Sequence, residues 1–355
     1  MKTKTLFVVA AGSGGHILPA LQCAQQWHND NPGSTVIFFT GTSELERKIR
    51  EKHTFITKAI PCHLTKFSSC WKIPLVMMQA IIILIKSMWY SFAYKPEKII
   101  STGGLLAIPV CIAGWCTRRI IDVYNLDAIP GKANRFLFPL ATTIFITFAQ
   151  TQASCKAFGI NYAHKCKLVP YPLRFTQTDR DIQPNVVIER INKQLEQRNF
   201  VHRFQPTRKT LFILGGSQGS MLLNTLIKGF IEQFPMMNNK LQIIHQTGAF
   251  QENTWDNWYA QHAIPALTFS YDEHVQHYYV ISDLIICRAG AGTMFEIAFF
   301  NKKCIVIPLV APTTAHQVQN AHAMAEQHPQ LFTILEQEIV SKNQTIFYDT
   351  LRTLI

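Results

Sequence analysis

Short runs of apolar residues alternate with longer stretches of helical spacing along most of the chain. The runs are rich in β-branched and aromatic residues, which favour strands. The predicted strands cover residues 5–11, 35–40, 97–101, 119–124, 143–147, 209–215, 241–246, 266–270, 283–287 and 303–308. Because amphipathic or apolar helical segments lie between them, the pattern predicts βαβ units and parallel sheets.

The alternation breaks once, in a polar stretch that predicts a single surface helix near 186–199. The sequence "LFVVAAGSGGHILPAL" (6–21) before the break has the same order of features as "LFILGGSQGSMLLNTL" (211–226) after it. Both read as an apolar strand, a Gly/Ser loop and an apolar helix. We therefore predict an α/β protein of two doubly wound Rossmann-like domains that face each other across a cleft. The predicted parts are an N-terminal domain at 1–172, a linker with its helix at 173–208, and a C-terminal domain at 209–355.

Charge separates the two halves of the chain. The 34 Lys and Arg exceed the 22 Asp and Glu by 12, and the whole excess lies in residues 1–172, which hold 19 basic and 7 acidic residues. A one-sided basic surface indicates an anionic partner, namely membrane headgroups, nucleic acid or a phosphorylated substrate. The nine cysteines form no CxxC pair or Cys/His cluster, so no zinc site is predicted. With no signal peptide ahead of the first strand, we expect reduced thiols in the cytosol.

The first glycine loop lies where a predicted strand meets a predicted helix. Gly12, Ser13, Gly14 and Gly15 do not form GxGxxG, which argues against a nicotinamide cofactor. Glycines here let backbone N–H groups approach an anion at the positive end of the helix, or they only shape a tight turn. A capping or core position is the plain interpretation of the next residue, His16.

A second loop, in "CRAGAGTMFEIAFF" (287–300), has small residues after a predicted strand and a helix predicted to begin near Thr293. Its exposed amides suit a diphosphate. Glu296 would then lie in the first turn, where it either binds paired ribose hydroxyls or complements the helix dipole. Three polar residues after the next strand suit sugar hydroxyls, or serve as helix caps: His316, Gln317 and Asn320.

The segment 71–95 combines an apolar run with residues typical of a membrane interface. Its run from Ile73 to Ile85 is shorter than the roughly 20 residues of a span. We predict a helix lying in the inner face of an anionic membrane, against the alternatives of a buried crossover helix and a transmembrane helix. The residues typical of an interface are Trp71, Trp89 and Tyr90, and those that would anchor the helix are Lys66, Lys72, Lys86 and Lys95.

Eight motifs, in one order, resemble those of the MurG family, GT-B glycosyltransferases that transfer N-acetylglucosamine to lipid I and make lipid II. The motifs are "GSGGHILPAL", "STGGLLAIPV", "IPGKANRFL", "PYPLR", "GGSQGSMLLN", "YDEHVQHYY", "CRAGAGTMFEI" and "HQVQNA". The resemblance covers most of the chain and implies a GT-B fold. It also implies a peripheral location on the cytoplasmic face of the cell membrane, with UDP-GlcNAc and lipid I as substrates and no nucleic acid as partner.

The resemblance assigns roles to individual residues. Ser13, Gly14, Gly15 and His16 belong to the acceptor-side loop. The residues assigned to the UDP-GlcNAc site are Arg174, Ser217, Gln218, the Tyr271 backbone, Ala291, Gly292, Thr293, Met294, Phe295, Glu296, His316 and Gln317. Glu296 is implied to take the ribose hydroxyls, as one of the two readings of its position had suggested.

One departure concerns the catalytic base. Where the family has His-Glu-Gln-Asn ahead of its Pro-Gly turn, this chain has "YNLD", Tyr124 to Asp127. His16 therefore becomes the predicted general base, and Asp127, also a predicted substrate contact, is its rival. The chain ends at Ile355, so the closing helix of the family is expected to be short or missing.

The implied reaction is a single displacement that inverts the anomeric centre. No DxD-like pair follows a strand, so helix dipoles rather than a metal ion or cofactor are expected to stabilise the leaving UDP. Two alternatives remain open: transfer to another lipid-linked or glycolipid acceptor, and a catalytically silent protein that binds nucleotide sugars.

Overall fold

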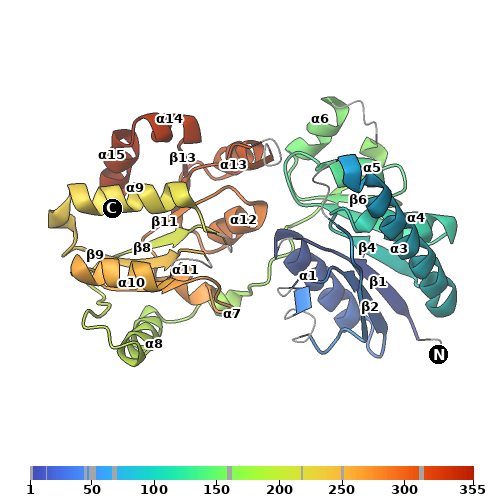
Figure 1. The fold of residues 1–355 in the computed structure, drawn as a ribbon, viewed down its shortest axis with the longest axis horizontal. Helices are drawn as coiled ribbons and strands as arrows, with labels where there is room; N and C mark the ends of the chain where they lie inside the picture. The colour runs from blue at the N-terminus through green and yellow to red at the C-terminus, as the bar shows by residue number, and fades with distance from the viewer. Residues whose placement is uncertain are drawn as a thin grey trace. The chain divides into compact units, whose positions relative to one another are not determined.

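The computed structural model divides the chain into two compact units, Met1–Arg174 and Phe175–Ile355, each with its own sheet (Figure 1). The residues it describes are 3–12, 14–43, 46–47, 53–65, 70–157, 162–216, 219–248, 252–311 and 316–355. From Phe175 onward, the stretch expected to be a linker belongs to the second unit.

All strands pair in parallel. Those of the first unit are β1 (Thr5–Val9), β2 (Thr35–Thr40), β3 (Lys58–Pro61), β4 (Lys98–Ser101), β5 (Ile120–Asn125), β6 (Thr143–Ile146) and β7 (Cys166–Leu168). Those of the second unit are β8 (Lys209–Leu214), β9 (Leu241–Gln246), β10 (Ala266–Phe269), β11 (Leu284–Cys287), β12 (Lys303–Val306) and β13 (Phe332–Ile334).

Helices connect these strands. The first unit contains α1 (Gly14–Asp30), α3 (Ile73–Tyr94), α4 (Ala107–Cys116), α5 (Lys132–Leu137) and α6 (Gln150–Ala157). The second contains α7 (Gln177–Arg180), α8 (Pro184–Gln197), α9 (Met221–Gln233), α10 (Glu252–Gln261), α11 (Gln276–Ile281), α12 (Ala291–Phe299), α13 (His316–Gln327), α14 (Gln337–Lys342) and α15 (Thr345–Leu354).

The two sheets share one topology. Their orders are β3-β2-β1-β4-β5-β6-β7 and β10-β9-β8-β11-β12-β13. Counted from the first strand of each unit, the second sheet reads 3-2-1-4-5-6, which is the order of a Rossmann fold, and the first sheet has the same order with a seventh strand, β7, added at its edge. The repeat predicted from 6–21 and 211–226 is thereby confirmed, because β1–α1 and β8–α9 take equivalent places in their sheets.

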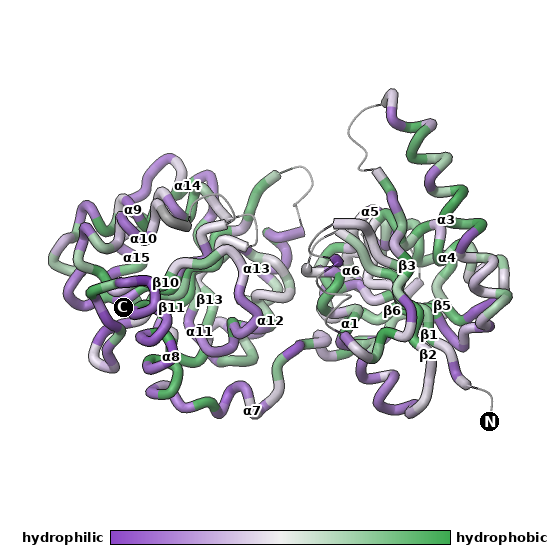
Figure 2. Tube along the Cα trace, turned by 60° about the horizontal axis from the view of Figure 1, so that its bottom comes forward, coloured by the Kyte–Doolittle hydropathy of each residue, from purple (hydrophilic) through white to green (hydrophobic). Residues whose placement is uncertain are grey.

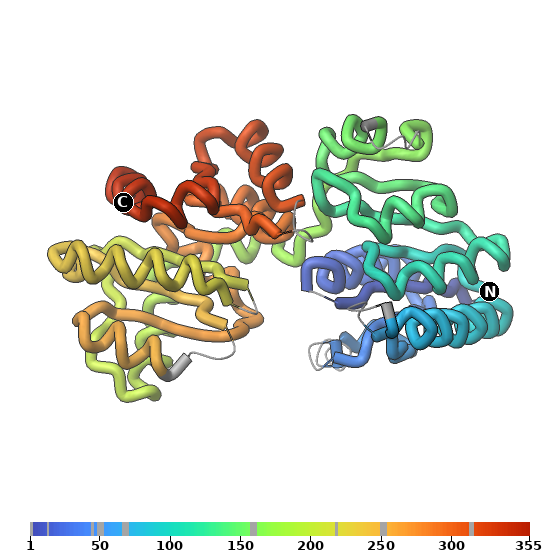
Figure 3. Tube along the Cα trace, turned by 45° about the horizontal axis from the view of Figure 1, so that its top comes forward, coloured from blue at the N-terminus to red at the C-terminus, as the bar shows by residue number. Residues whose placement is uncertain are grey.

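The central strands are buried on both faces. Phe7 and Val9 of β1 join a core with residues of α3 and α4, whereas Leu6 and Val8 join one with α1. Figure 3 shows α3 and α4 side by side along the first unit. Two-sided burial explains why β1 reads as a continuous apolar run instead of an alternation.

Three strands escaped sequence analysis, and each lies at the edge of its sheet. They are β3, β7 and β13, of three or four residues each. An edge strand pairs on one side only and is partly exposed, so its sequence lacks the apolar run that marks the central strands.

Helix α3 is longer than its sequence suggested and exposes most of its apolar surface. It has 22 residues, about 33 Å at the usual rise of about 1.5 Å per residue. Among the described residues it alone is long and apolar enough to cross a membrane, and 17% of its most apolar window is buried. Helix length therefore does not exclude a membrane span, and the alternative of a fully buried crossover helix was wrong. Figure 2 shows its first turns extending beyond neighbouring elements.

Candidate functional site

The candidate residues gather at the carboxyl ends of the central strands, where Rossmann folds bind ligands. In the first unit, the loop after β1 lies against the loop after β4. Gly104 has φ +90°, and a Cβ there would lie 3.1 Å from the Ala11 carbonyl oxygen. Glycine therefore allows the two loops to approach each other closely.

His16 is fixed by this neighbouring loop. Its Nδ1 lies 2.9 Å from the Thr102 carbonyl oxygen, and the Thr102 hydroxyl donates to the His16 carbonyl at 2.8 Å. A carbonyl can only accept, so Nδ1 of the neutral ring carries the proton and Nε2 is the basic nitrogen. The half-buried ring is thus held in the tautomer that a general base requires.

The amide of Gly12 is already occupied by the protein. Its N–H donates to Glu46 Oε1 at 3.0 Å, and Gly41 donates to the same oxygen at 3.1 Å. Ser43 donates to the other oxygen through its N–H at 2.9 Å and its hydroxyl at 2.6 Å. The idea that glycine amides of this loop bind an anion therefore fails at Gly12. Ser13 lies outside the described residues, and Gly14 and Gly15 begin α1.

Glu46 was missed by sequence analysis although its signal is present. Ser43 and Glu46 have the S-x-x-E spacing of a capping box. Burial alone would raise the pKa of this 3% exposed carboxyl, but the hydrogen bonds from Ser43, Gly12 and Gly41 outweigh it and lower the pKa below its usual value. Glu46 is therefore a buried anion that joins the loops after β1 and β2.

The stretch Tyr124–Asp127 comprises the last two residues of β5, the strand beside β4 in the sheet, and the two residues that follow it. Tyr124 stacks on Phe145 with ring centroids 4.6 Å apart, and burial raises its pKa. Asn125 is buried, donates to the Asp127 carbonyl at 2.6 Å and accepts from Asn134 at 3.0 Å. Of the four residues, half-buried Asp127 is the one that carries a carboxylate.

In the second unit, the loop after β8 is shaped by glycines. Gly219 has φ +73°, and a Cβ there would lie 2.3 Å from the Thr247 carbonyl oxygen, so the loop requires glycine. The Gly216 amide donates to Gln246 at 3.0 Å. Ser217 and Gln218 lie outside the described residues.

Arg288 links three loops of this unit by hydrogen bonds. The sequence analysis singled out the small residues that follow it and not Arg288 itself. Nε donates to the Ser220 hydroxyl at 3.0 Å, and Nη1 donates to the Ile307 carbonyl at 3.0 Å and to Gln337 at 2.9 Å. Burial lowers the pKa of its guanidinium. The sequence signal for such an anchor was one positively charged residue between a buried strand and a loop of small residues.

Helix α12 begins earlier than expected, which moves Glu296. Gly290 is the N-cap, and the helix runs from Ala291 rather than Thr293, because alanine favours helix. Glu296 therefore lies in the second turn, where the helix dipole has little effect on it. Tyr279 donates its hydroxyl to Glu296 Oε2 at 2.8 Å. Met294 is fully buried, so its side chain cannot contact a ligand.

The remaining predicted residues differ in how far the protein buries them. Gln317 accepts from the Leu309 amide at 3.0 Å. Asn320 is fully buried and donates to the Ala289 carbonyl at 3.3 Å, so it supports the α12 loop and does not contact sugar hydroxyls. Tyr271 is 48% exposed. The residues that are half-buried are Arg174, Gly292, Thr293, Phe295 and His316.

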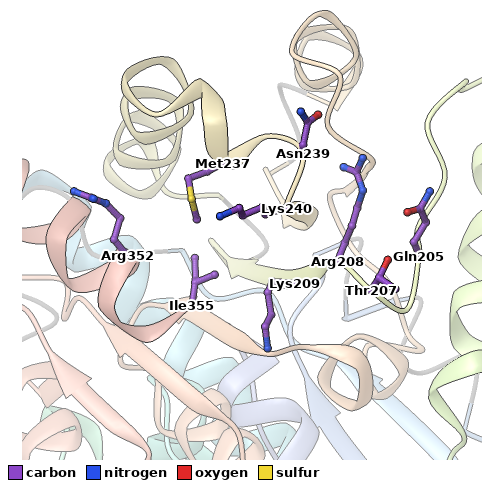
Figure 4. A pocket seen from close by; sticks show the side chains of 9 residues that line it. All are labelled: Gln205, Thr207, Arg208, Lys209, Met237, Asn239, Lys240, Arg352 and Ile355. Carbon is purple, nitrogen blue, oxygen red and sulfur yellow. The ribbon is translucent and has the colours of Figure 1, made fainter.

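A cavity of about 620 Å³ in the second unit lies away from these loops (Figure 4). Its lining includes Lys209, which begins β8, and Lys240, which precedes β9. These are the amino ends of the strands, so the cavity is separate from the candidate site. Among the described residues, no three His, Cys, Asp or Glu side chains form a group suited to a metal ion.

Two Rossmann-like domains with candidate residues at the carboxyl ends of both sheets are the arrangement of the GT-B fold. Residues 6–146 match the sequence model of the glycosyltransferase family 28 N-terminal domain, and residues 210–343 match that of the C-terminal domain. The chain belongs to glycosyltransferase family 28 and is similar along most of its length to MurG-type transferases.

Curated relatives share this assignment along almost the whole chain. A UDP-N-acetylglucosamine–N-acetylmuramyl-(pentapeptide) pyrophosphoryl-undecaprenol N-acetylglucosamine transferase of Pelagibacter ubique is 27% identical over 320 residues, 90% of this chain and 81% of the relative. The same transferase of Halothermothrix orenii is 28% identical over 337 residues, 90% and 82% of the two chains.

Solved structures agree on the fold. The crystal structure of MurG from Acinetobacter baumannii covers 99% of this chain and 90% of its own, with a TM-score of 0.69 and 21% identity. A UDP-GlcNAc 2-epimerase from Neisseria meningitidis, bound to UDP-GlcNAc, covers 92% of both chains with a TM-score of 0.57 and 13% identity. The fold alone therefore does not distinguish a transferase from an epimerase.

Proposed function

We propose that the chain transfers N-acetylglucosamine from UDP-GlcNAc to the MurNAc 4-hydroxyl of lipid I. The observation that carries the proposal is that candidate residues lie at the carboxyl ends of the central strands in both sheets, on a chain whose relatives are named for this reaction over nine tenths of its length. We assign the acceptor to the first unit and the nucleotide sugar to the second.

The chemistry rests on His16 and α12. The acceptor hydroxyl oxygen attacks the anomeric carbon while its proton passes to His16 Nε2, and the bond from that carbon to the diphosphate oxygen breaks. Thr102 stabilises the resulting imidazolium through its carbonyl. UDP leaves with its charge facing the amides at the start of α12, whose dipole favours an anion. A single displacement inverts the anomeric centre.

The outer face of α3 is proposed to lie in an anionic membrane surface, where the lipid acceptor resides. Large apolar side chains cover this face, and lysines flank it, as in interfacial helices. The exposed apolar residues are Trp71, Ile73, Leu75, Met77, Met78, Ile81, Ile82, Ile85, Trp89 and Phe92. Lys72, Lys86 and Lys95 provide the basic rim, and Lys66 lies outside the described residues. This arrangement supports a peripheral location on the cytoplasmic face.

The inner side of α3 keeps the helix on the unit, which favours lying on the membrane over crossing it. Ile83 and Tyr90 pack in the same core as β1. The Ser91 hydroxyl lies 2.6 Å from that of Thr117, directly after α4. A helix that crossed the membrane would have to give up these contacts.

A second candidate is transfer to another lipid-linked or glycolipid acceptor. It is favoured by the replaced stretch at the end of β5, where Asp127 carries the one carboxylate of four residues. This replacement would alter the binding site for the acceptor and leave the binding site for the donor unchanged.

One assay separates these functions. Labelled UDP-GlcNAc is incubated with the protein and either a lipid I analogue or other polyprenyl-linked sugars. We expect label in the lipid I product, with the anomer opposite to that of the donor. Transfer only to another acceptor supports the second candidate. UDP-GlcNAc binding without any transfer supports a silent binding protein. Release of an epimerised sugar excludes both transferase functions and the silent binding protein.

A further inference from the structure

We infer that Tyr279 is a positioning residue for recognition of the nucleotide's ribose hydroxyls, because it holds the Glu296 carboxylate. The inference rests on the proposed function, with the ribose of the nucleotide sugar taken to lie at Glu296, as predicted from the sequence. Tyr279 belongs to α11 and Glu296 to α12, and the tyrosine hydroxyl donates to Glu296 Oε2 at 2.8 Å.

The Tyr279 ring cannot easily move. It is 1% exposed and stacks on Phe300, with centroids 5.0 Å apart and planes 10° apart. Phe212 meets it edge-on at 5.4 Å and Phe175 at 6.1 Å. A ring held between aromatic neighbours has a fixed hydroxyl position, so the group that it binds is held in the same place.

The bond matters because Glu296 has a flexible side chain. Ordering a glutamate on binding costs side-chain entropy, and a hydrogen bond made beforehand reduces this cost. A carboxylate has about four acceptor positions, so one bond from Tyr279 is compatible with further bonds from ribose hydroxyls.

Charge gives the same bond a second effect. Glu296 lies in the second turn of the helix whose first amides are proposed to hold the diphosphate. The Glu296 carboxylate would repel that anion. The Tyr279 hydroxyl donates to the carboxylate and stabilises its negative charge at the position where it is held.

Calorimetry with two nucleotides tests the inference. The probes are UDP and 2′,3′-dideoxy-UDP, which lacks both ribose hydroxyls. We expect the wild type to bind the dideoxy nucleotide about 10- to 100-fold more weakly than UDP. Tyr279→Phe keeps the ring and should weaken UDP binding about 3- to 10-fold while leaving dideoxy-UDP binding unchanged. A loss of packing would weaken both nucleotides equally.

Two further variants complete the design. In a Glu296→Ala background, Tyr279→Phe should have no additional effect, since its target is gone. Tyr348→Phe is the matched control, because this tyrosine of α15 donates to Gln344, directly before α15, and not to a candidate site residue. This variant should bind both nucleotides as the wild type does. Thermal unfolding monitored by circular dichroism verifies that each variant is folded.

The outcomes distinguish the inference from the proposed function. Equal weakening of both nucleotides by Tyr279→Phe, no weakening of either, or additive effects with Glu296→Ala would each overturn the positioning role. Equal wild-type affinity for the two nucleotides would overturn it as well, because no hydroxyl would then be recognised. If the wild type binds neither UDP nor UDP-GlcNAc, the proposed function itself fails.

Discussion

His16 and Thr102 are joined by two hydrogen bonds, one through the imidazole and one through the threonine hydroxyl, at 2.9 and 2.8 Å. The pair connects the first turn of α1 to the loop after β4. The imidazole is therefore oriented by a neighbouring strand's loop and not only by its own helix. Thr102 is fully buried, so solvent does not compete for its hydroxyl.

This arrangement predicts that His16→Ala lowers turnover about 10²- to 10⁴-fold, because the base is lost. UDP-GlcNAc affinity should stay within about twofold, since the proposed donor contacts lie in the other unit. Steady-state kinetics with a lipid I analogue, together with donor calorimetry, check both expectations. Asp127→Asn serves as the comparison and should lower turnover less than His16→Ala does. If Asp127→Asn instead abolishes transfer while His16→Ala retains most of it, Asp127 is the base.

Replacing Glu46 should destabilise the first unit. Glu46→Gln leaves an amide nitrogen that cannot accept, so we expect a loss of about 1–3 kcal/mol in the free energy of unfolding at neutral pH. Urea unfolding at pH 7 measures it. Glu232→Gln, on an exposed pair with Lys228 at 3.9 Å, is the control and should change stability by at most about 1 kcal/mol.

The pH dependence of the same variant follows from the sign of its pKa shift. The folded pKa of Glu46 lies below its ordinary value of 4.5, so its stabilisation is full above pH 4.5 and is lost as pH falls through the folded pKa. The wild type should therefore lose more stability than Glu46→Gln below pH 4.5. Parallel pH profiles for the two proteins would contradict the ionised state of Glu46.

His245 should produce a separate loss of stability at mildly acidic pH. It is fully buried, with Nδ1 2.9 Å from the Tyr259 hydroxyl and Nε2 3.0 Å from Asn224 Oδ1. Burial lowers its pKa from 6.5 to about 3. The unfolded state then takes up the proton first, so stability falls as pH drops from 6.5 towards 3. His245→Gln should flatten this part of the profile and cost about 1–3 kcal/mol at pH 7.

The control for that measurement is His322→Gln, because His322 is exposed on α13. It should unfold with the same pH profile as the wild type. An unchanged slope in His245→Gln between pH 6.5 and 4.5 would show that another group causes the acid sensitivity.

Membrane binding should depend on the lysines around α3. Changing both Lys72 and Lys86 to glutamate should reduce co-sedimentation with vesicles containing anionic lipid about 10-fold or more, since each basic residue near the surface contributes about 1 kcal/mol. Lys228 and Lys240 of the second unit, changed in the same way, form the charge-matched control and should leave binding unaltered. Equal loss in both double variants would indicate a general charge effect without a role for α3.

The sequence allowed the central strands to be predicted because burial on both faces gives them apolar runs, as in β1. Those runs, with the Gly/Ser loops behind them, also led to the repeated fold and to the loops around His16 and Glu296. The resemblance to a family added the individual site residues, whose roles stay predictions.

The parts that escaped prediction depend on contacts between distant segments. Glu46 binds Gly12, 34 residues away, and Arg288 binds Ser220, 68 residues away. The spacing of residues along the sequence does not reveal which distant residues will contact each other. The turn occupied by Glu296 was missed for a local reason, since Ala291 and Gly292 had been placed in the loop although both are helical.

The exposed face of α3 also determines how the chain behaves once it is taken out of the cell. In plain buffer, each copy presents a strip of tryptophan, methionine and isoleucine to water, and such strips associate with one another or with any amphiphile supplied. Apparent rates will therefore vary with protein concentration and with the detergent or lipid in the tube. Colloidal state belongs among the controlled variables of every assay on this enzyme, alongside pH and salt.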